Sequence, residues 1–402
     1  MSHTVADALA RVLVSAGFGR CFGYLGHHVE HLPRALIRAG CQVVIAASET
    51  GAGYIALGLA LASGRPSLTF CGGSPGLAML IPALQVARLE GIPLLAIVGQ
   101  TGSNGLPTFQ NTRSSGSRDR ELLSALRVTN FHLEVAEHLP EVLERAWEQL
   151  SKGGPVVITV ACDVMAAPWP DQPKRAQGSL PLRALNQWQW LDPMAASATP
   201  QISLQPEQNV QPFRVGSYGA VVAELLALMP ADTLWFGDAG QTRHSMGSEL
   251  ARQGIPFFQA SSTGPMGWAL AAAIGAACHQ PTRPVCCFTG DGSALMLANE
   301  WTTAVKLHLP ITFVLAENGV LGGPYSRLRD TEAEHLGRLP ALNWCALAEA
   351  LGLPAKCVDG TMSLAEALAA LSASGPRLLV VALPERDPAV RAPYELLQPL
   401  DR

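Results

Sequence analysis

Hydrophobic residues along the chain fall into short continuous runs that alternate with longer stretches of helical periodicity. The alternation occupies residues 4–165 and returns after residue 213. Short apolar runs of this kind are typical of strands buried on both faces of a sheet. The pattern therefore predicts an α/β fold of two domains, each a mostly parallel sheet with helices on both faces. The expected strands are 20–24, 42–47, 67–70, 94–98 and 156–160, then 233–237, 284–289, 312–316 and 378–382.

Helical periodicity places a first helix directly after Thr4, which is a suitable N-cap residue. In the second half we expect helices at 217–229, 265–277, 297–307, 344–351 and 364–372. Residues 166–212 follow neither pattern, being rich in Pro, Gln and Ala and containing three Trp. We interpret them as a long connection, too short for a domain of its own and partly ordered by packing of its Trp residues. The predicted organisation is 1–165, a linker at 166–212, and 213–402.

The composition indicates a protein that buries more surface than a monomer. Charged residues make up 15% of the chain and apolar residues 48%, with a mean hydropathy of +0.20, whereas about 25% charged residues is usual. Burial in an oligomer explains these values, and so does a high Ala content in helices. The net charge of −4 and the absence of any Lys/Arg block longer than two residues give no reason to expect a nucleic acid or membrane partner.

The lengths of the apolar runs, the N-terminal sequence and the cysteine spacing together suggest a cytoplasmic protein. The longest apolar runs, such as 268–278, are shorter than the roughly 18 residues of a membrane span, and the N-terminus lacks the basic region of a signal peptide. None of the nine cysteines has C-x-x-C spacing, which argues against a disulfide framework or a structural zinc site. Most of them lie in apolar runs, where we expect buried thiols.

A glutamate at a strand-to-helix junction raises the first question of function. In VVIAASETGAGYIALG (43–58), Gly51, Gly53 and Ala56 have the G-x-G-x-x-A spacing of a dinucleotide-binding site. That motif also expects an acidic residue about 20 positions later, but no Asp or Glu lies between Glu49 and Glu90. A nicotinamide- or flavin-dependent oxidoreductase therefore loses its main support, and Glu49 needs another explanation.

The segment VCCFTGDGSA (285–294) contains the strongest chemical signal. A strand ends at Gly-Asp-Gly-Ser and a helix begins, and a helix N-terminus offers free N–H groups to phosphate. Asn318 follows Asp291 by 27 residues, at the end of the next strand. Because neighbouring parallel strands end at the same edge, both side chains can face one cation, and oxygen ligands with phosphate suit Mg²⁺. The simpler alternative is a turn in which Asp291 caps the helix.

These motifs resemble those of the thiamine-diphosphate (ThDP) enzymes of the acetolactate synthase, benzoylformate decarboxylase and pyruvate decarboxylase type. The resemblance implies that Asp291, Asn318 and the carbonyl of Val320 hold Mg²⁺. The chain departs from the family's Asn-Asn-Gly at Glu317. The residues implied near the diphosphate are Gly240 and Gln241 of FGDAGQ (236–241), together with Gly290, Gly292 and Ser293.

The aminopyrimidine half of the cofactor has its own matching segments. STGPMGW (262–268) resembles the part of the family in which the residue at Met266 supports the bent cofactor and the carbonyl at Gly264 accepts from its 4′-amino group. As an alternative, Met266 fills the core. In the first half, FGYLG (22–26), SETGAG (48–53), GSPG (73–76) and IPLLAIVGQ (92–100) follow the family's order.

The resemblance gives Glu49 a role. In the family, the glutamate at this position bonds N1′ of the aminopyrimidine and promotes loss of the thiazolium C2 proton, while a helix cap is the plain alternative. The small residues of G-x-G-x-x-A then bring the helix close to a cofactor edge. In the family the cofactor lies between the first domain of one chain and the last domain of another, which implies a homodimer or a dimer of dimers.

Most members of the resembled family carry a middle domain, which holds FAD or a nucleotide, where this chain has only residues 166–212. The phosphonopyruvate and sulfopyruvate decarboxylases are two-domain members that lack it. The resemblance to this two-domain form implies that FAD, ADP and CoA chemistry is not expected. We expect non-oxidative decarboxylation of a 2-oxo acid through a ThDP-bound enamine, with an acetolactate-synthase-like carboligase as the alternative and a non-catalytic ThDP-binding subunit as a third class. His27 as proton donor favours the decarboxylase, unless it is a solvated loop residue. Phe109 and Gln110 favour the carboligase. The candidates for a second anionic group on the substrate are Arg113, Arg243 and Arg327.

Overall fold

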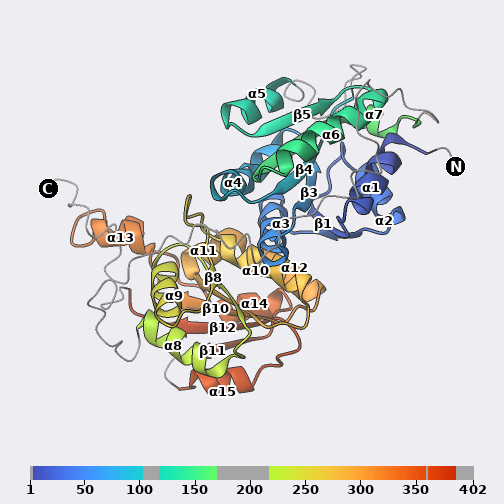
Figure 1. Ribbon diagram of the computed structural model, residues 1–402. Helices are drawn as coiled ribbons and strands as arrows, with labels where there is room; N and C mark the ends of the chain where they lie inside the picture. Colours follow the sequence, from blue (N-terminus) through green and yellow to red (C-terminus); the bar gives the residue numbers. More distant parts are fainter. Residues whose placement is uncertain (1–2, 103–116, 170–216, 359–360, 386–402) are drawn as a thin grey trace. The chain divides into compact units, whose positions relative to one another are not determined.

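A computed structural model describes residues 3–102, 117–169, 217–358 and 361–385 (Figure 1). The chain divides into two compact units, residues 1–199 and 200–402, and each is described here by itself. Each unit contains one sheet of six strands, and every strand pairing in both sheets is parallel. The α/β fold with two parallel sheets is therefore confirmed.

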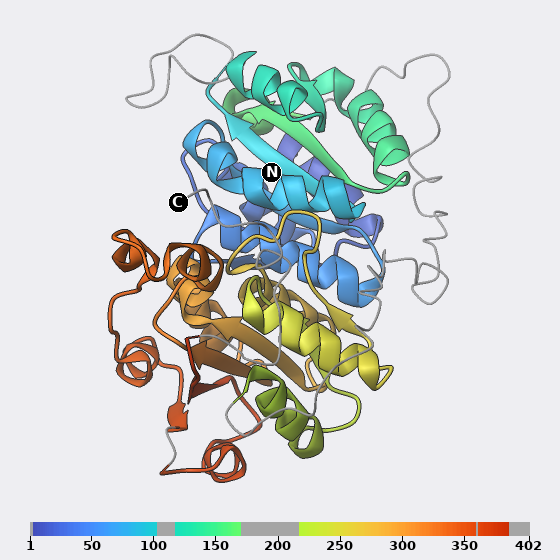
Figure 2. The same ribbon diagram turned by 90° about the vertical axis from the view of Figure 1, so that its left-hand side faces the viewer.

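The first sheet has the strand order β2-β1-β3-β4-β6-β5. Its buried core lies between one face of the sheet and helices α1, α2, α6 and α7, whereas α3 and α4 pack on the strands from the other face and run side by side (Figure 2). The strands are β1 (Arg20–Gly23), β2 (Gln42–Ile45), β3 (Ser67–Gly72), β4 (Leu94–Gln100), β5 (Thr129–Leu133) and β6 (Pro155–Ala161). The helices are α1 (Val5–Ser15), α2 (His31–Arg38), α3 (Glu49–Ser63), α4 (Pro75–Glu90), α5 (Ser117–Ala125), η1 (Ala136–His138), α6 (Leu139–Leu150) and α7 (Cys162–Ala166).

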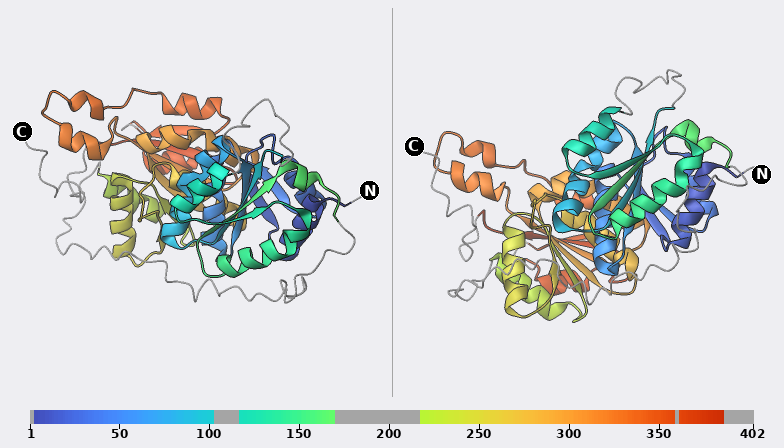
Figure 3. Two further views of the ribbon diagram at one scale, coloured as in Figure 1. Left: turned by 90° about the horizontal axis from the view of Figure 1, so that it is seen from above. Right: turned by 45° about the horizontal axis from the view of Figure 1, so that its top comes forward.

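The second sheet has the order β11-β12-β10-β9-β7-β8. Helices α8, α9 and α15 pack on one face. Helices α10 and α12 lie on the other face (Figure 3). There Phe236 contacts Trp268 of α10, and Phe313 contacts Trp301 of α12, with ring centroids 6.1 and 6.3 Å apart. The strands are β7 (Leu234–Gly237), β8 (Phe257–Phe258), β9 (Val285–Gly290), β10 (Ile311–Glu317), β11 (Ala355–Val358) and β12 (Arg377–Ala382). The helices are α8 (Tyr218–Leu228), α9 (Gln241–Arg252), α10 (Trp268–His279), α11 (Asp291–Leu297), η3 (Ala298–Glu300), α12 (Trp301–Lys306), α13 (Gly322–Leu328), η4 (Glu334–Gly337), α14 (Trp344–Ala350) and α15 (Leu364–Ala369).

All nine expected strands are present, with ends shifted by one or two residues. Thr4 caps α1 as predicted, and Asp7 completes a capping box with it. Strands β5, β8 and β11 were not predicted because they are edge strands that are short or only partly buried. The predicted helix 297–307 is divided into the 3₁₀ turn η3 and the helix α12.

Seven cysteines carry free thiols, and all of these except Cys162 are buried, in line with the expected state. Cys345 and Cys357 differ from that expectation, because they form a disulfide between α14 and β11. Among the residues described, no helix combines the length and the apolar character that crossing a bilayer requires.

Parallel pairing decides where loops meet in each unit. In the first sheet Gly72 of β3 is opposite Gly99 of β4, and in the second Gly290 of β9 is opposite Ala316 of β10. The segments that follow these residues therefore leave each sheet at one edge, its C-terminal edge. Ligands of open parallel sheets bind at such an edge, and the candidate site residues lie there in both units.

Candidate active site

The second unit holds Asp291 in a set of backbone N–H groups at the start of α11. Its Oδ2 accepts from the N–H groups of Asn318 and Gly319 at 3.0 and 2.7 Å, and its Oδ1 accepts from Gly292 at 2.8 Å. Burial raises the pKa of Asp291, and these three hydrogen bonds act in the opposite direction. A carboxylate offers about four acceptor positions, so Oδ1 keeps one that can face a cation.

Asn318 is brought to Asp291 as the strand spacing predicted, and its side chain is also fixed. The amide Nδ2 donates to the Tyr218 hydroxyl at 2.7 Å, and Oδ1 accepts from the N–H of Val320 at 3.1 Å. The neighbouring Glu317 lies close enough to be repelled by Asp291, since burial and the Asp291 carboxylate both raise the pKa of Glu317. Two carboxyl groups at the ends of the neighbouring strands β9 and β10 favour a bound cation, which would relieve their repulsion.

Asp238 belongs to the segment FGDAGQ (236–241), but the sequence motifs did not single it out. It is 1% exposed and joins three segments of the edge. Oδ1 accepts from the N–H groups of Ala239 and Gly267 at 2.9 and 3.0 Å, and Oδ2 accepts from the Thr289 hydroxyl at 2.9 Å. Burial raises the pKa of Asp238 to about 6, against the lowering effect of these hydrogen bonds. Gly237-Asp238 and Gly290-Asp291 end two neighbouring strands, and this repeated pair was the available sequence signal.

Met266 and Gly292 form a wall next to Asp291. A Cβ added to Gly292 would lie 2.8 Å from Leu321 Cδ2 and 3.1 Å from Met266 Cε, so a larger residue at position 292 would displace the ends of these two side chains. Ser293 is buried beside them, with 2% exposure, and Gly290 ends β9 before them. Met266 thus lies beside the metal motif, as the resemblance requires.

Gln241, the first residue of α9, has a buried side-chain oxygen without a hydrogen-bond donor among the described residues. Gln241 is 7% exposed, and within the described residues its Oε1 atom accepts no hydrogen bond. The preceding Gly240 has a φ of 96°, and no atom lies within 4 Å of the position of an added Cβ. Arg243, on the same helix, reaches Gly264, with one guanidinium nitrogen 3.2 Å from the corresponding Cβ position.

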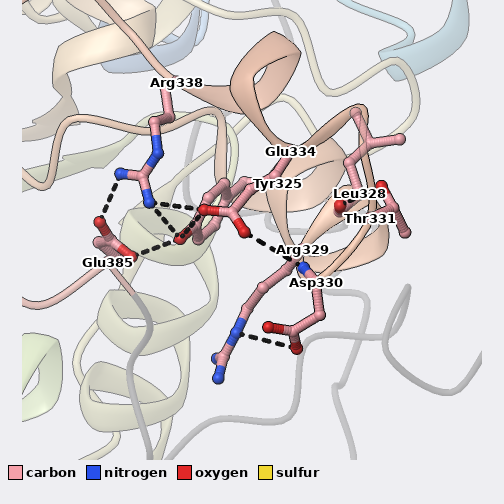
Figure 4. Close-up of polar contacts among 8 residues, drawn as sticks. All are labelled: Tyr325, Leu328, Arg329, Asp330, Thr331, Glu334, Arg338 and Glu385. Atoms are coloured by element: carbon pink, nitrogen blue, oxygen red, sulfur yellow. Dashed lines mark hydrogen bonds and ion pairs between the residues drawn. The ribbon is translucent and has the colours of Figure 1, made fainter.

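A polar cluster fixes the chain that follows Val320 (Figure 4). Val320 pairs with Arg338 in an isolated bridge. The Arg338 guanidinium donates to Glu334 and Glu385 at 2.7 Å each and lies over the ring of Tyr325, 5.0 Å from its centroid. The Tyr325 hydroxyl donates to Glu385 at 2.6 Å, and this hydrogen bond contributes most to raising the pKa of Tyr325 to about 12. Arg327 lies in the same segment and is exposed.

The first unit presents Glu49 at the start of α3. Ser48 caps this helix by accepting from the N–H of Gly51 at 3.0 Å, so Glu49 is not needed as the cap. Its Oε1 lies 3.2 Å from the position of a Cβ added to Gly76, at the start of α4. Within the described part of the chain, no donor bonds the half-buried Glu49 carboxylate.

Gly53 of G-x-G-x-x-A packs against a neighbouring helix. A Cβ on Gly53 would lie 2.4 Å from the Ala83 Cβ and 2.7 Å from Leu80 Cδ1, both on α4. The small residue therefore allows α3 to approach α4. The expectation that it serves a cofactor edge is wrong for Gly53, because helix packing occupies that side.

The remaining candidates divide into exposed, buried and undescribed residues. His27 is exposed and His28 is buried. Burial and the nearby His27 lower the pKa of His28. A Cβ on Gly99 would lie 2.1 Å from the His28 carbonyl oxygen, so this turn lies directly on the end of β4. Phe109, Gln110 and Arg113 lie outside the described residues.

Two family models match the chain. The model described as thiamine pyrophosphate enzyme, N-terminal TPP binding domain, matches residues 3–117, and the model described as thiamine pyrophosphate enzyme, C-terminal TPP binding domain, matches residues 238–381. Thiamine pyrophosphate is another name for ThDP. The chain therefore belongs to the family of thiamine pyrophosphate enzymes.

Individual relatives cover smaller regions. The chain is 30% identical over 167 residues to the probable 2-ketoarginine decarboxylase AruI of Pseudomonas aeruginosa, over 41% of this chain and 30% of the relative. It is 29% identical over 173 residues to the acetolactate synthase isozyme 2 large subunit of Escherichia coli, over 41% and 31%. The isozyme 1 large subunit of Escherichia coli is 33% identical over 128 residues, over 31% and 22%. These alignments span less than a third of each relative.

The residues present fit a diphosphate and a divalent cation. The donor set of carboxylate, amide oxygen and backbone carbonyl suits Mg²⁺, and the unpartnered Oε1 of Gln241 lies on the loop expected to meet the diphosphate. Within the described ranges, no group of three or more His, Cys, Asp or Glu side chains is placed to hold a metal. A Mg²⁺ site here would therefore depend on Asp291 as its carboxylate ligand and on phosphate oxygens.

Proposed function

We propose that this chain is a ThDP- and Mg²⁺-dependent decarboxylase of a 2-oxo acid. The observation that carries the proposal is the retention of both halves of the site in one chain. Asp291 accepts hydrogen bonds from three backbone N–H groups, one of which belongs to Asn318. Glu49 presents a carboxylate without a donor among the described residues. A subunit that only binds ThDP needs the first half but has no use for the second.

Each residue has a defined part in this proposal. Asp291, Asn318 and the Val320 carbonyl hold Mg²⁺, and Met266 and Gly264 receive the aminopyrimidine. Glu49 holds a proton at N1′ of the pyrimidine. When bound, ThDP supplies a carbon nucleophile and an electron sink for the release of CO₂. The residues proposed to meet the diphosphate are Gly240, Gln241, Gly290, Gly292 and Ser293.

Decarboxylation and ligation differ in what happens after CO₂ leaves. A decarboxylase delivers a proton to the remaining fragment, and His27, exposed in the turn after β1, is our candidate donor. One relative is named a 2-ketoarginine decarboxylase, which supports this choice. A carboligase is the second candidate because other relatives are named acetolactate synthases. In that case Phe109 and Gln110 receive the second carbonyl compound.

The assembly is also a proposal. Glu49 belongs to the first unit and Asp291 to the second. We propose a homodimer or a dimer of dimers in the cytoplasm, with the site formed by the first unit of one chain and the second unit of another. The low charged fraction of 15% supports burial of additional surface. Light scattering on the purified protein tests the assembly, and a monomer that is active would contradict it.

Product analysis tests the proposed reaction. The protein is incubated with ThDP, Mg²⁺ and a panel of 2-oxo acids with aliphatic, aromatic, guanidino, phosphonate or sulfonate side chains, and CO₂ and organic products are measured together. CO₂ with a free aldehyde is the expected result. CO₂ with a 2-hydroxyketone or acetohydroxy acid would replace the decarboxylase by the carboligase. ThDP binding without CO₂ and without exchange of its C2 proton would favour the non-catalytic subunit.

A further inference from the structure

A second buried carboxylate, Asp119, lies at the C-terminal edge of the first sheet. It is 4% exposed. Its Oδ2 accepts from the backbone N–H of Ser74 at 3.1 Å and from Nε2 of Gln100 at 3.3 Å. One oxygen thus joins α5, the turn after β3 and the end of β4. The sequence motifs drew attention to the turn but not to Asp119.

Ser74 has a backbone conformation that a residue with a side chain rarely adopts. Its φ and ψ are 56° and −104°, in a region that is populated almost only by glycine, and such residues cost about 1–3 kcal/mol each. A conformation of this kind persists only where its surroundings impose it. The hydrogen bond from Ser74 to Asp119 is a direct restraint of that kind.

The same turn carries the contact to Glu49. Pro75 and Gly76 begin α4, and Glu49 Oε1 lies 3.2 Å from the position of a Cβ on Gly76. The Cys71 thiol lies close enough to both Glu49 and Asp119 for their charges to change its pKa. Burial raises the pKa of the Cys71 thiol, and the charges of Glu49 and Asp119 raise it further. Asp119 therefore contacts the beginning of the turn 73–76, and Glu49 lies next to its end.

We propose that Asp119 is a positioning residue for Glu49. Asp119 accepts hydrogen bonds from Ser74 and Gln100 and so holds the turn 73–76 in its strained form. The position of this turn then determines where the Glu49 carboxylate lies. The proposal rests on the function proposed above, in which Glu49 acts at N1′ of ThDP. Asp119 acts on Glu49 through these two hydrogen bonds, which both end on its Oδ2 atom.

This geometry predicts a specific pattern among variants. Asp119→Ala removes the acceptor and releases the turn, and we expect C2 proton exchange in bound ThDP to slow about 10- to 100-fold, the scale of an error of about 1 Å in the position of a catalytic group. Asp119→Asn keeps an oxygen in place of Oδ2, so exchange stays within about 3-fold of wild type. Ser74→Gly adopts the turn without strain, so adding it to Asp119→Ala restores most of the lost rate.

The experiment measures hydrogen–deuterium exchange at C2 of ThDP by NMR, with saturating ThDP and Mg²⁺, and the ThDP affinity of each variant. Asp7→Asn is the matched control, because Asp7 is another carboxylate of the first unit that accepts a backbone N–H, from Thr4 at 3.0 Å. It should lower thermal stability without slowing exchange. If Asp119→Ala does not fold, the Asp119→Asn and Ser74→Gly proteins and the double variant Asp119→Ala/Ser74→Gly still provide the comparison.

The outcomes separate this proposal from the function beneath it. If the wild type neither binds ThDP nor exchanges its C2 proton, the proposed function falls, and with it the role of Asp119. If the wild type exchanges and Asp119→Ala does so equally fast, only the role of Asp119 is wrong. Equal losses in Asp119→Asn and Asp119→Ala, or no recovery with Ser74→Gly, would overturn positioning through the turn. Slow exchange in Asp119→Ala with unchanged ThDP affinity and recovery by Ser74→Gly supports it.

Discussion

Glu49 at the first sheet edge and the two aspartates at the second edge differ in the hydrogen-bond donors that surround them. In the second unit, Asp291 and Asp238 together accept from five backbone N–H groups and one hydroxyl. In the first unit, Glu49 has no donor among the described residues, although Ser48, one residue earlier, caps the same helix. The second edge is therefore organised before any ligand arrives. The first edge keeps one carboxylate without a donor of its own.

Because of this difference, substitutions at the two sites should have different effects on stability and on catalysis. Removing a carboxylate that satisfies buried donors leaves those donors unpaired and destabilises the fold. Removing one that has no protein partner leaves the fold almost unchanged but removes its chemistry. Substitutions at the second edge should therefore reduce both stability and ligand affinity. A substitution at Glu49 should reduce the reaction alone.

The largest combined effect is expected for Asp291→Ala. We expect the affinity for ThDP in the presence of Mg²⁺ to fall by more than about 100-fold, since even the outer partners of metal ligands are worth 10- to 100-fold. The unfolding free energy should fall by about 2 kcal/mol because three N–H groups lose their acceptor. Titration of ThDP followed by Trp fluorescence, with Mg²⁺ or with EDTA, measures the first effect.

Asp291→Asn is the control for this comparison. The amide keeps an acceptor for part of the N–H set but loses the charge that is proposed to hold the cation. Stability should recover relative to Asp291→Ala while ThDP affinity stays low. An affinity equal to that of the wild type in either variant would remove the metal assignment.

Asp238 gives a pH-dependent prediction. Its pKa is raised from 3.8 to about 6 in the folded chain, so between about pH 4 and pH 6 the folded state binds more protons than the unfolded state. The contribution of Asp238 to stability is therefore lost as the pH rises through this window. Asp238→Asn cannot titrate, and its stability relative to the wild type should improve by up to about 3 kcal/mol between pH 4 and pH 7.

Denaturant unfolding at a series of pH values measures this difference. Asp232→Asn is the matched control in the same unit, because Asp232 is exposed, and its difference from the wild type should not depend on pH. A stability difference for Asp238→Asn that is constant over the same range would contradict the raised pKa of Asp238.

Ser74→Gly should stabilise the protein by about 1 kcal/mol, since glycine adopts the φ of 56° without steric conflict. The same substitution at Ser217, where φ is −87° and the side chain caps α8, should instead destabilise by a few tenths of a kcal/mol. Thermal unfolding of the two variants measures the contrast. A loss of stability at Ser74 would show that the turn holds no strain.

The smallest effect is expected at the cluster of Figure 4. Arg338→Ala removes the ion pairs with Glu334 and Glu385, but Arg338 and Glu385 are nearly half exposed, and pairs of this kind contribute little. We expect a slight fall in the unfolding temperature, larger at low salt than at high salt. Arg329→Ala, which removes only the exposed contact with Asp330, should leave it unchanged. A large, salt-independent loss for Arg338→Ala would mean that the cluster stabilises the segment after Val320 by packing and not by charge.

The sequence predicted the features that depend on local pattern. Continuous apolar runs gave all nine expected strands, and parallel order then placed Asp291 beside Asn318, because neighbouring parallel strands end at one edge. Glu49 was placed correctly at its strand-to-helix junction because the apolar run 43–47 ends just before it. These inferences needed only the direction of the strands.

Features that depend on distant contacts were not predictable in this way. Asp238 joins Gly267 and Thr289, which lie 29 and 51 residues further along the chain, and Asp119 reaches back 45 residues to Ser74. The repeated Gly-Asp pair at two strand ends marks Asp238 itself, but no local pattern marks the distant partners of Asp238 and Asp119. Gly53 shows the converse error, since its spacing suggested a ligand while its lack of a side chain serves the contact with Ala83.

The most direct test of the central claim is C2 proton exchange of ThDP in the wild type and in Glu49→Gln, together with the thermal unfolding of both proteins without cofactor. We predict that exchange in Glu49→Gln falls by about 10²- to 10⁴-fold, the usual contribution of a positioned acid or base, while the unfolding temperature stays the same. Equal exchange rates in the two proteins would contradict the role of Glu49. A marked loss of stability in Glu49→Gln would contradict the contrast between the two edges.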